Sequence, residues 1–362
     1  MSSFFNFLLK NVKFPTGSLF FWSNSGSLLF LILLVQILSG LLLVLYFDNI
    51  SYYSFISVQY LMYEVNFGWF IRLLHFNGAS IFFFVLFFHF LKSLLNYGYR
   101  LVEVYLIGMM ILLVLMGEAF LGYVLLWSQM SYWAGVVITN LISVIPFFGF
   151  LIKNFFWGSY VFGSNALKIF FLLHFILPFI IIFFVLMHFY YLHYYMSTSN
   201  INFNFFLDKN KFYSYYIIKD LFNFFFFIIF FLWLLFLPFK LGDSLMFEES
   251  DYLVSPIHIV PEWYFLFVYA ILRAIPSKFL GVLFLLLSIL IFIIYLFYLN
   301  YNFLFDKFNK LILVFFFNLL VFLSYLGQCV VEEPFIFLSQ LLSFFYFFVI
   351  LFVYFIYLLS KV

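Results

Sequence analysis

Two stretches of this chain carry histidines in otherwise apolar sequence. His75 and His89 lie in LHFNGASIFFFVLFFHF, and His174 and His188 lie in FLLHFILPFIIIFFVLMHFYY. Fourteen residues separate the two histidines of each pair. On an α-helix this interval is a rise of about 21 Å and a rotation that returns to within about 40° of the same face. Each pair is therefore predicted to lie on one helical face, four turns apart.

The equal spacing favours shared ligation. A single histidine in a membrane helix could equally be a polar residue satisfied by a neighbouring helix. Two facing helices, however, could clamp one flat ring at each level with one imidazole from each helix. Haem suits this arrangement, and a bis-histidine iron has no open position, which favours electron transfer. A tetrahedral zinc site would need three or four nearby ligands, and within the long apolar stretches no other His, Cys or carboxylate pair follows this spacing.

Glycines repeat the interval. Gly26 and Gly40 are fourteen residues apart, as are Gly108 and Gly122, in two further apolar stretches. A missing side chain lets a broad ring approach the backbone. The sequence therefore predicts a four-helix bundle that holds two non-covalently bound b-type haems, stacked along the membrane normal.

Basic residues accompany the first histidine pair. Arg72 lies three residues before His75, and Lys92 lies three residues after His89. Each could reach a haem propionate as a charge-assisted partner. Snorkelling of the side chain to the membrane interface is the alternative, and it suits Lys92 better than Arg72.

Composition predicts an all-α polytopic membrane protein. Of 362 residues, 68% are hydrophobic and 8% are charged, so the chain could not stay soluble as a globular protein. The single cysteine, Cys329, excludes an internal disulfide, a thiolate-held iron–sulfur cluster and c-type haem attachment. Eight stretches are long enough to cross about 30 Å of hydrocarbon: residues 20–46, 69–95, 104–126, 169–195, 219–239, 279–300, 311–329 and 335–360.

Loop charges predict the orientation. The side that holds the N-terminus collects ten of the sixteen Lys and Arg residues, whereas the opposite side is acidic. By the positive-inside rule, both termini are expected on the cytoplasm-equivalent side.

The segment SPIHIVPEWYFLFVYAILRAIPSK (255–278) is less hydrophobic than its surroundings and contains three prolines. We expect a re-entrant or surface helix on the acidic side, beginning at Pro261. Glu262 adjoins Trp263 and Tyr264, and a carboxylate in apolar surroundings has a raised pKa and can pass protons near neutral pH. An acidic residue favoured by the helix dipole explains Glu262 equally well.

These motifs resemble one family. PEWYFLFVYAILRAIP, the paired histidines and glycines, and GYVLLWSQMSYWAGVVITNLISVIPFFG are similar to the cytochrome b family of the respiratory ubiquinol:cytochrome c reductase, complex III. The resemblance covers nearly the whole chain. The spacing from His174 to His188 and the eight helices in one polypeptide resemble the respiratory branch. In the photosynthetic relative the chain is split and that spacing is one residue longer.

The resemblance implies a role for each motif. His75 and His174 would ligate the outer haem (bL), and His89 and His188 the inner haem (bH). Quinol would be oxidised at the outer face and quinone reduced at the inner face, coupled to proton translocation. The quinol-oxidation pocket would comprise Pro261, Glu262, Trp263, Tyr264, Tyr123, Met130 and Tyr269, with Glu262 as proton acceptor. The quinone-reduction site would comprise His193, Ser197, Lys219 and Asp220, of which the residues alone would suggest only an interfacial histidine and a solvated ion pair.

The resemblance also implies a setting. It predicts a multi-pass protein of the mitochondrial inner membrane with matrix-side termini, a bacterial cytoplasmic membrane being the second choice. Expected partners are a Rieske iron–sulfur protein, cytochrome c1, further subunits, a second copy of the complex and lipid, without nucleic acid. Residues 1–200 would form the diheme bundle, and residues 201–362 the C-terminal domain.

Some residues depart from the family pattern. Leu126-Trp127-Ser128 replaces a Pro-Trp-Gly run, Lys92 stands where arginine is usual, and Ala134 stands where glycine is usual. Glu118 is a carboxylate inside the third span with no counterpart in the family pattern.

Two other functions fit part of the pattern. A diheme membrane anchor of another quinone-linked dehydrogenase or of a ferric reductase would not call for eight spans with a PEWY loop. A proton-coupled transporter could use the histidines as proton relays, but it should show broken helices and repeat symmetry.

Overall fold

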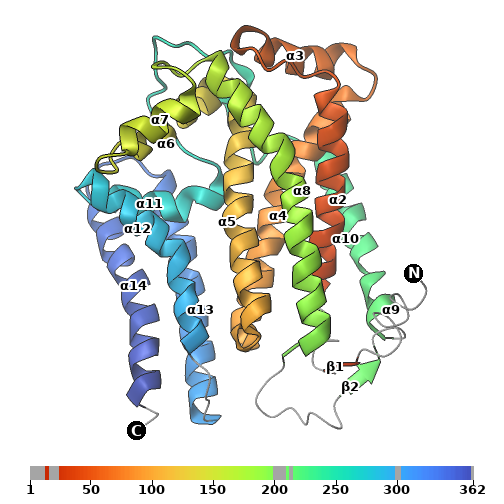
Figure 1. Ribbon diagram of the computed structural model, residues 1–362, viewed down its shortest axis with the longest axis vertical. Helices are drawn as coiled ribbons and strands as arrows, with labels where there is room; N and C mark the ends of the chain where they lie inside the picture. Colours follow the sequence, from red (N-terminus) through yellow and green to blue (C-terminus); the bar gives the residue numbers. More distant parts are fainter. Residues whose placement is uncertain (1–12, 16–23, 199–208, 212–214, 298–302, 360–362) are drawn as a thin grey trace.

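The computed structural model describes residues 13–15, 24–198, 209–211, 215–297 and 303–359, and Figure 1 shows them as a bundle of long helices. Within these ranges, eight helical segments are long and apolar enough to cross a membrane, which confirms the predicted fold class. Six of them coincide with or lie within α2 (Ser25–Val44), α4 (Gly68–Leu95), α5 (Val102–Leu125), α8 (Ser164–Tyr195), α13 (Phe303–Gln328) and α14 (Phe335–Leu359). The other two join α9 (Ile217–Asp220) to α10 (Asn223–Phe236), and α12 (Lys278–Leu290) to the 3₁₀ segment η7 (Ile291–Phe297).

Shorter elements gather mainly near the upper end of the molecule in Figure 1. They are α3 (Ser51–Glu64), α6 (Gln129–Ile142), α7 (Gly149–Trp157), η5 (Ser244–Phe247), η6 (Trp263–Phe265) and α11 (Leu266–Ala274), while η3 (Gly98–Arg100) joins α4 to α5. At the lower end, β1 (Lys13–Pro15) pairs antiparallel with β2 (Lys209–Lys211), a small ribbon that the all-α prediction did not include. The end of α14 lies at this same end (Figure 1). Which side of the membrane it faces stays a prediction.

The first four spans form two close pairs. The most extensive packing joins α5 to α8, and α2 packs almost as closely on α4. Halfway between the two histidine levels, one buried apolar residue from each helix fills the bundle: Leu33, Phe82, Leu115 and Ile181. Each of these lies seven residues, or about two turns, from a histidine or glycine of each level. An apolar layer therefore separates the two levels.

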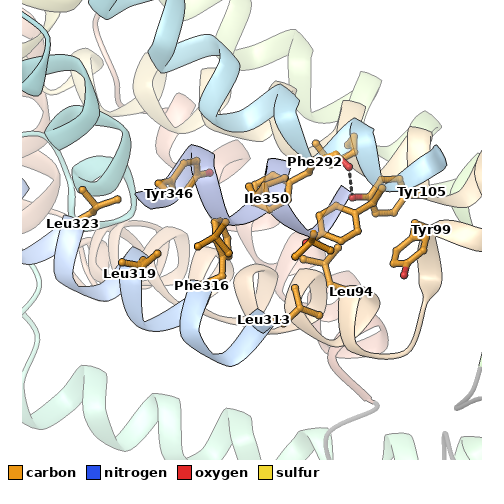
Figure 2. Close-up of a cluster of buried hydrophobic side chains, with 14 of the residues drawn as sticks. Leu94, Tyr99, Tyr105, Phe292, Leu313, Phe316, Leu319, Leu323, Tyr346 and Ile350 are labelled. Carbon is orange, nitrogen blue, oxygen red and sulfur yellow. Dashed lines mark hydrogen bonds between the residues drawn. The ribbon is translucent and has the colours of Figure 1, made fainter. Parts of the chain in front are cut away.

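The C-terminal helices attach to this bundle through a second core, shown in Figure 2. Leu94 at the end of α4, Tyr99 of η3 and Tyr105 near the start of α5 meet Phe292 of η7 and buried side chains of α13 and α14. The Tyr105 hydroxyl donates to the main-chain oxygen of Phe292 at 2.9 Å, and the Tyr346 hydroxyl donates to that of Ser288 at 2.6 Å. Both hydrogen bonds fix the position of the segment in which the α-helix α12 changes to the 3₁₀ helix η7.

The predicted helix start at Pro261 is two residues too early. Glu262 still has extended backbone, with ψ at 150°, and the first turn is the 3₁₀ segment η6 that continues into α11. The Tyr269 hydroxyl donates to the main-chain oxygen of Ile259 at 3.1 Å, so the approach to the helix is held against α11 in a non-helical path. At the other end, Arg273 donates to the carbonyls of Leu326 and Cys329 at the end of α13.

Replacing either tyrosine of the second core by phenylalanine should destabilise the protein. Tyr105→Phe and Tyr346→Phe each remove one buried hydrogen bond, so each is expected to lower the free energy of unfolding by about 1 kcal/mol. The measurement is the thermal midpoint of the purified protein in detergent. Tyr325→Phe is the control, because the Tyr325 side chain is 61% exposed. Equal effects of all three substitutions would contradict the role given to the two hydrogen bonds.

Candidate functional site

The structure brings the four histidines together in two pairs. His75 of α4 faces His174 of α8 with 6.3 Å between ring centres and 86° between ring planes. His89 of α4 faces His188 of α8, also with 6.3 Å between ring centres, and 60° between ring planes. Two imidazoles whose nitrogens each lie about 2 Å from one metal ion on opposite sides have ring centres about 6 Å apart. Both pairs therefore have the spacing that axial ligation of one metal requires.

Each histidine ring lies against one of the predicted glycines. A Cβ atom added to Gly40 would lie 3.1 Å from Cε1 of His75, and one on Gly26 would lie 3.3 Å from Cε1 of His89. On α5, a Cβ on Gly108 would lie 3.4 Å from Cε1 of His188.

The fourth contact is tighter. A Cβ on Gly122 would overlap the ring of His174, so alanine there would force the ring to move. The four glycines thus hold the imidazoles at the helix backbone.

Hydrogen bonds at Nδ1 orient three of these rings. The Ser39 hydroxyl lies 3.0 Å from Nδ1 of His75, and the Ser25 hydroxyl lies 3.2 Å from Nδ1 of His89. Nδ1 of His174 lies 3.0 Å from the main-chain oxygen of Glu118. The carbonyl oxygen can only accept the Nδ1 proton of His174 and so leaves Nε2 free for a metal, whereas each serine hydroxyl orients its ring and can donate or accept.

Gly122 also explains how a carbonyl oxygen inside helix α5 can accept a hydrogen bond from His174. A helical side chain covers the turn that precedes its own Cα. Glu118 lies four residues before Gly122, so the missing Cβ uncovers the Glu118 carbonyl that His174 reaches.

A cavity with about 1340 Å³ of empty volume, partly open to the surroundings, lies at the level of His75 and His174. Its lining includes Gly40, Gly122 and Arg72. The histidine rings and glycines of this level therefore border one partly open space between the four helices, and Arg72 adds a cation to its lining.

The predicted quinol-oxidation residues meet mainly at the start of η6. Burial, and to a smaller extent the nearby Asp243, raise the pKa of Glu262 to about 7 against the opposing effect of the Arg72 guanidinium. Tyr264 is buried and stacks on Phe83 of α4, with 4.1 Å between ring centres. At near-neutral pH, Glu262 can therefore exist in both protonation states.

The remaining members of this predicted group lie around it. Trp263 packs edge-on against Phe87, and Tyr123 interacts electrostatically with Glu262. Met130 is buried at the start of α6, and its place in a quinol pocket stays a prediction. Tyr269 uses its hydroxyl on the Ile259 carbonyl.

Gln129 joins α6 to the irregular loop that precedes the PEWY motif. Its main-chain NH donates to the Glu248 carbonyl at 2.9 Å, and its side chain donates to the Val254 carbonyl and accepts from the Asp251 NH. Ser128, at the family's glycine position, caps α6 through a reciprocal bond with Ser131. The departure from the family pattern thus has a local structural role.

The predicted inner-site pair Lys219 and Asp220 is tied to the start of α2. The Ser27 hydroxyl donates to Oδ1 of Asp220 at 2.7 Å, and the Asn24 side chain donates to the Lys219 carbonyl at 2.7 Å. Asn223 donates to the Ser27 oxygen at 3.0 Å. The first turn of α2 also contains Ser25, whose hydroxyl lies near Nδ1 of His89. The inner histidine level and the pair Lys219–Asp220 are therefore both in contact with this turn.

His193 and Ser197 are less closely defined. His193 lies in the last turn of α8 and Ser197 follows that helix. The Ser197 hydroxyl is buried with no hydrogen-bond partner among the described residues. That they join Lys219 and Asp220 in one site stays a prediction, as does the approach of Lys92 to the inner histidine level.

Sequence reasoning missed the polar residues that support the histidines. Ser25 and Ser39 each precede a paired glycine, so the repeated Ser-Gly dipeptide was an available signal. Asn24, Ser27 and Asn223 carry no such repeat.

Two family models match the chain. One, described as cytochrome b/b6/petB, matches residues 10–196, and the other, described as cytochrome b(C-terminal)/b6/petD, matches residues 249–347. Proteins named cytochrome b from Caenorhabditis elegans and Caenorhabditis briggsae are each 46% identical over 324 residues, covering 90% of this chain and 88% of theirs. Cytochrome b of Apis mellifera ligustica is 40% identical over 350 residues, covering 96% and 91%.

A solved chain described as "Hyperthermophilic respiratory Complex III" has the same fold. It superposes with a TM-score of 0.86 at 24% identity, over 98% of this chain and 96% of that one. With two family models and relatives matched along nine-tenths of its length, this chain belongs to the cytochrome b family.

Proposed function

We propose that this chain is the diheme b-type cytochrome subunit of a ubiquinol:cytochrome c reductase in the mitochondrial inner membrane. The observation that carries the proposal is the pair of facing imidazoles at each of two levels, with 6.3 Å between ring centres in both. The separation would let each pair of imidazoles hold one haem iron, and the glycines let the histidine rings lie close to the neighbouring helix backbones.

The chain's residues would hold the two haems as follows. His75 and His174 would hold the outer haem and His89 and His188 the inner one, and Arg72 and Lys92 would supply cations for the propionates. When bound, the haems supply one-electron carriage across the membrane. The apolar layer between the levels keeps water out of the space that separates them.

Glu262 is the proton acceptor at the outer quinol site. Its pKa of about 7 lets it take a proton from quinol near neutral pH and release it toward the acidic surface. At the inner end, Asp220 is held by Ser27, and with His193 it supplies protons to quinone from the basic side. This assignment places both termini on the matrix side.

The outer reaction needs partner proteins. Quinol gives up two electrons, and a chain with a single cysteine cannot ligate an iron–sulfur cluster to take one of them by a separate route. We therefore infer a Rieske iron–sulfur protein and cytochrome c1 as partners, in a homodimeric complex with further subunits. Residues 1–200 act as the diheme domain, and residues 201–362 complete the quinone sites.

Filling the space beside His174 should disturb haem binding at one level. Gly122→Ala is expected to displace the His174 ring and lower the outer-haem content by about half or more. The matched control is Gly117→Ala, because a Cβ there meets nothing within 4 Å. Reduced-minus-oxidised spectra and haem counts of the purified protein decide this. Absence of b-type haem from the unaltered protein would refute the proposed function.

Removing the Glu262 carboxylate should slow quinol oxidation without loss of haem. Glu262→Gln is expected to reduce the rate about tenfold, less than a full proton acceptor contributes because water can partly replace it. A group with a pKa of about 7 is mostly protonated below pH 7. Activity of the unaltered complex should therefore rise as pH increases through 7, and this rise should be absent from the variant. The control is Glu249→Gln, an exposed carboxylate on the preceding loop.

Breaking the Ser27–Asp220 bond should affect the inner reaction alone. Asp220→Asn is expected to slow quinone reduction about tenfold by removing a proton donor, and Ser27→Ala should slow it less. The measurement is reduction of added quinone, with quinol oxidation in the same preparation as the internal control. An equal slowing of both reactions would argue against an inner site at Asp220.

A further inference from the structure

Glu118 stands at the outer histidine level. Oε1 of its side chain lies 2.7 Å from Nδ1 of His174, and its main-chain oxygen lies 3.0 Å from the same atom. The residue is 9% exposed, in the middle of α5, and it lines the same cavity as His75, His174 and Arg72. Its other oxygen, Oε2, is buried with no hydrogen-bond partner in the described part of the chain.

Burial of the Glu118 carboxylate at this position costs free energy, which suggests that the residue has a function. A buried carboxylate oxygen without a hydrogen bond loses its hydration without return. The other three bundle glycines have no carboxylate at the corresponding position: the residue four places before Gly40 is Gln36, before Gly108 it is Val104, and before Gly26 it is Trp22.

The other rings are supported differently. Nδ1 of His75 and of His89 meets a serine hydroxyl, which can donate or accept a hydrogen bond. An ionised carboxylate can only accept, so it requires a proton on Nδ1 and leaves Nε2 as the free nitrogen. A carboxylate at the second nitrogen also makes an imidazole a more basic ligand than a neutral partner does.

We propose that Glu118 is a positioning residue that sets the reduction potential of the outer haem through His174. Its carboxylate accepts the Nδ1 proton of His174, fixes the ring with Nε2 toward the cavity, and strengthens the imidazole as an electron donor. A stronger donor stabilises ferric over ferrous iron, so the potential of the outer haem is held low. This proposal rests on the proposed function, because it requires His174 to be a haem ligand.

The test is a potentiometric titration of both haems in the assembled complex. Glu118→Gln keeps the size of the side chain but replaces the carboxylate by a neutral amide. At a fixed ambient potential, the ferrous-to-ferric ratio of the outer haem is expected to rise on the order of tenfold, which for one electron is about 59 mV. The inner haem should not shift. Glu118→Asp, which keeps the carboxylate, should restore part of the difference, and Gly117→Ala should leave both potentials unchanged.

Two results would overturn the proposal. One is a Glu118→Gln complex with both haems bound and the outer potential unaltered, and the other is an equal shift of both haems. Infrared difference spectra of the unaltered complex, with ¹³C-labelled glutamate, give a second test that needs no variant. A carboxylate band should change when the outer haem is reduced and stay constant when the inner haem is reduced. An unaltered protein that lacks b-type haem would instead refute the proposed function.

Discussion

The bundle depends on the contact of four imidazole rings with helix backbone. Each ring needs a neighbouring helix without a side chain at one position, and the four glycines provide those positions. The requirement fixes which helices pair, because α2 must lie beside α4 and α5 beside α8 at both levels. Membrane helices gain little from burying apolar surface against one another, so such close backbone contacts and their hydrogen bonds can decide the packing.

The same constraint separates polar from apolar layers. Polar groups that support the rings occur at the two histidine levels, whereas Leu33, Phe82, Leu115 and Ile181 fill the space between. In this low-dielectric layer, an unpaired polar atom would be costly. The polar residues of the two proposed quinone sites lie farther out, at Glu262 toward one end and Asp220 toward the other. The chain thus arranges its chemistry in layers across the membrane.

Much of this arrangement could be predicted because, on a regular α-helix, the spacing of residues in the sequence determines which of them lie on the same face. The eight spans, the two histidine levels with one ligand from each of two helices, and the glycines at the same interval follow from apolar length and from one spacing. The pairing of His75 with His174 and of His89 with His188 follows from the family resemblance. The partners of Nδ1 could not be predicted in the same way. Whether Ser25 or Glu118 reaches a ring depends on how two helices cross.

Irregular segments are the other part of the structure that could not be predicted from the sequence. The bonds from Gln129 to the loop before the PEWY motif, and the extended backbone at Glu262, have no periodic signal in the sequence. The helices α3, α6 and α7 are too short to be recognised as spans. Family membership now leaves the dehydrogenase-anchor and transporter alternatives without support.

The fourteen-residue interval has a consequence for how this chain can change over time. The distance between the two levels is set by the rise of the polypeptide along α4 and α8, a covalent length that lipid-facing side chains do not determine. Those side chains need only be apolar, and the chain contains 67 phenylalanines. Mutational bias toward one bulky residue can therefore accumulate on the outer surface of the bundle while the distance between the two histidine levels stays the same.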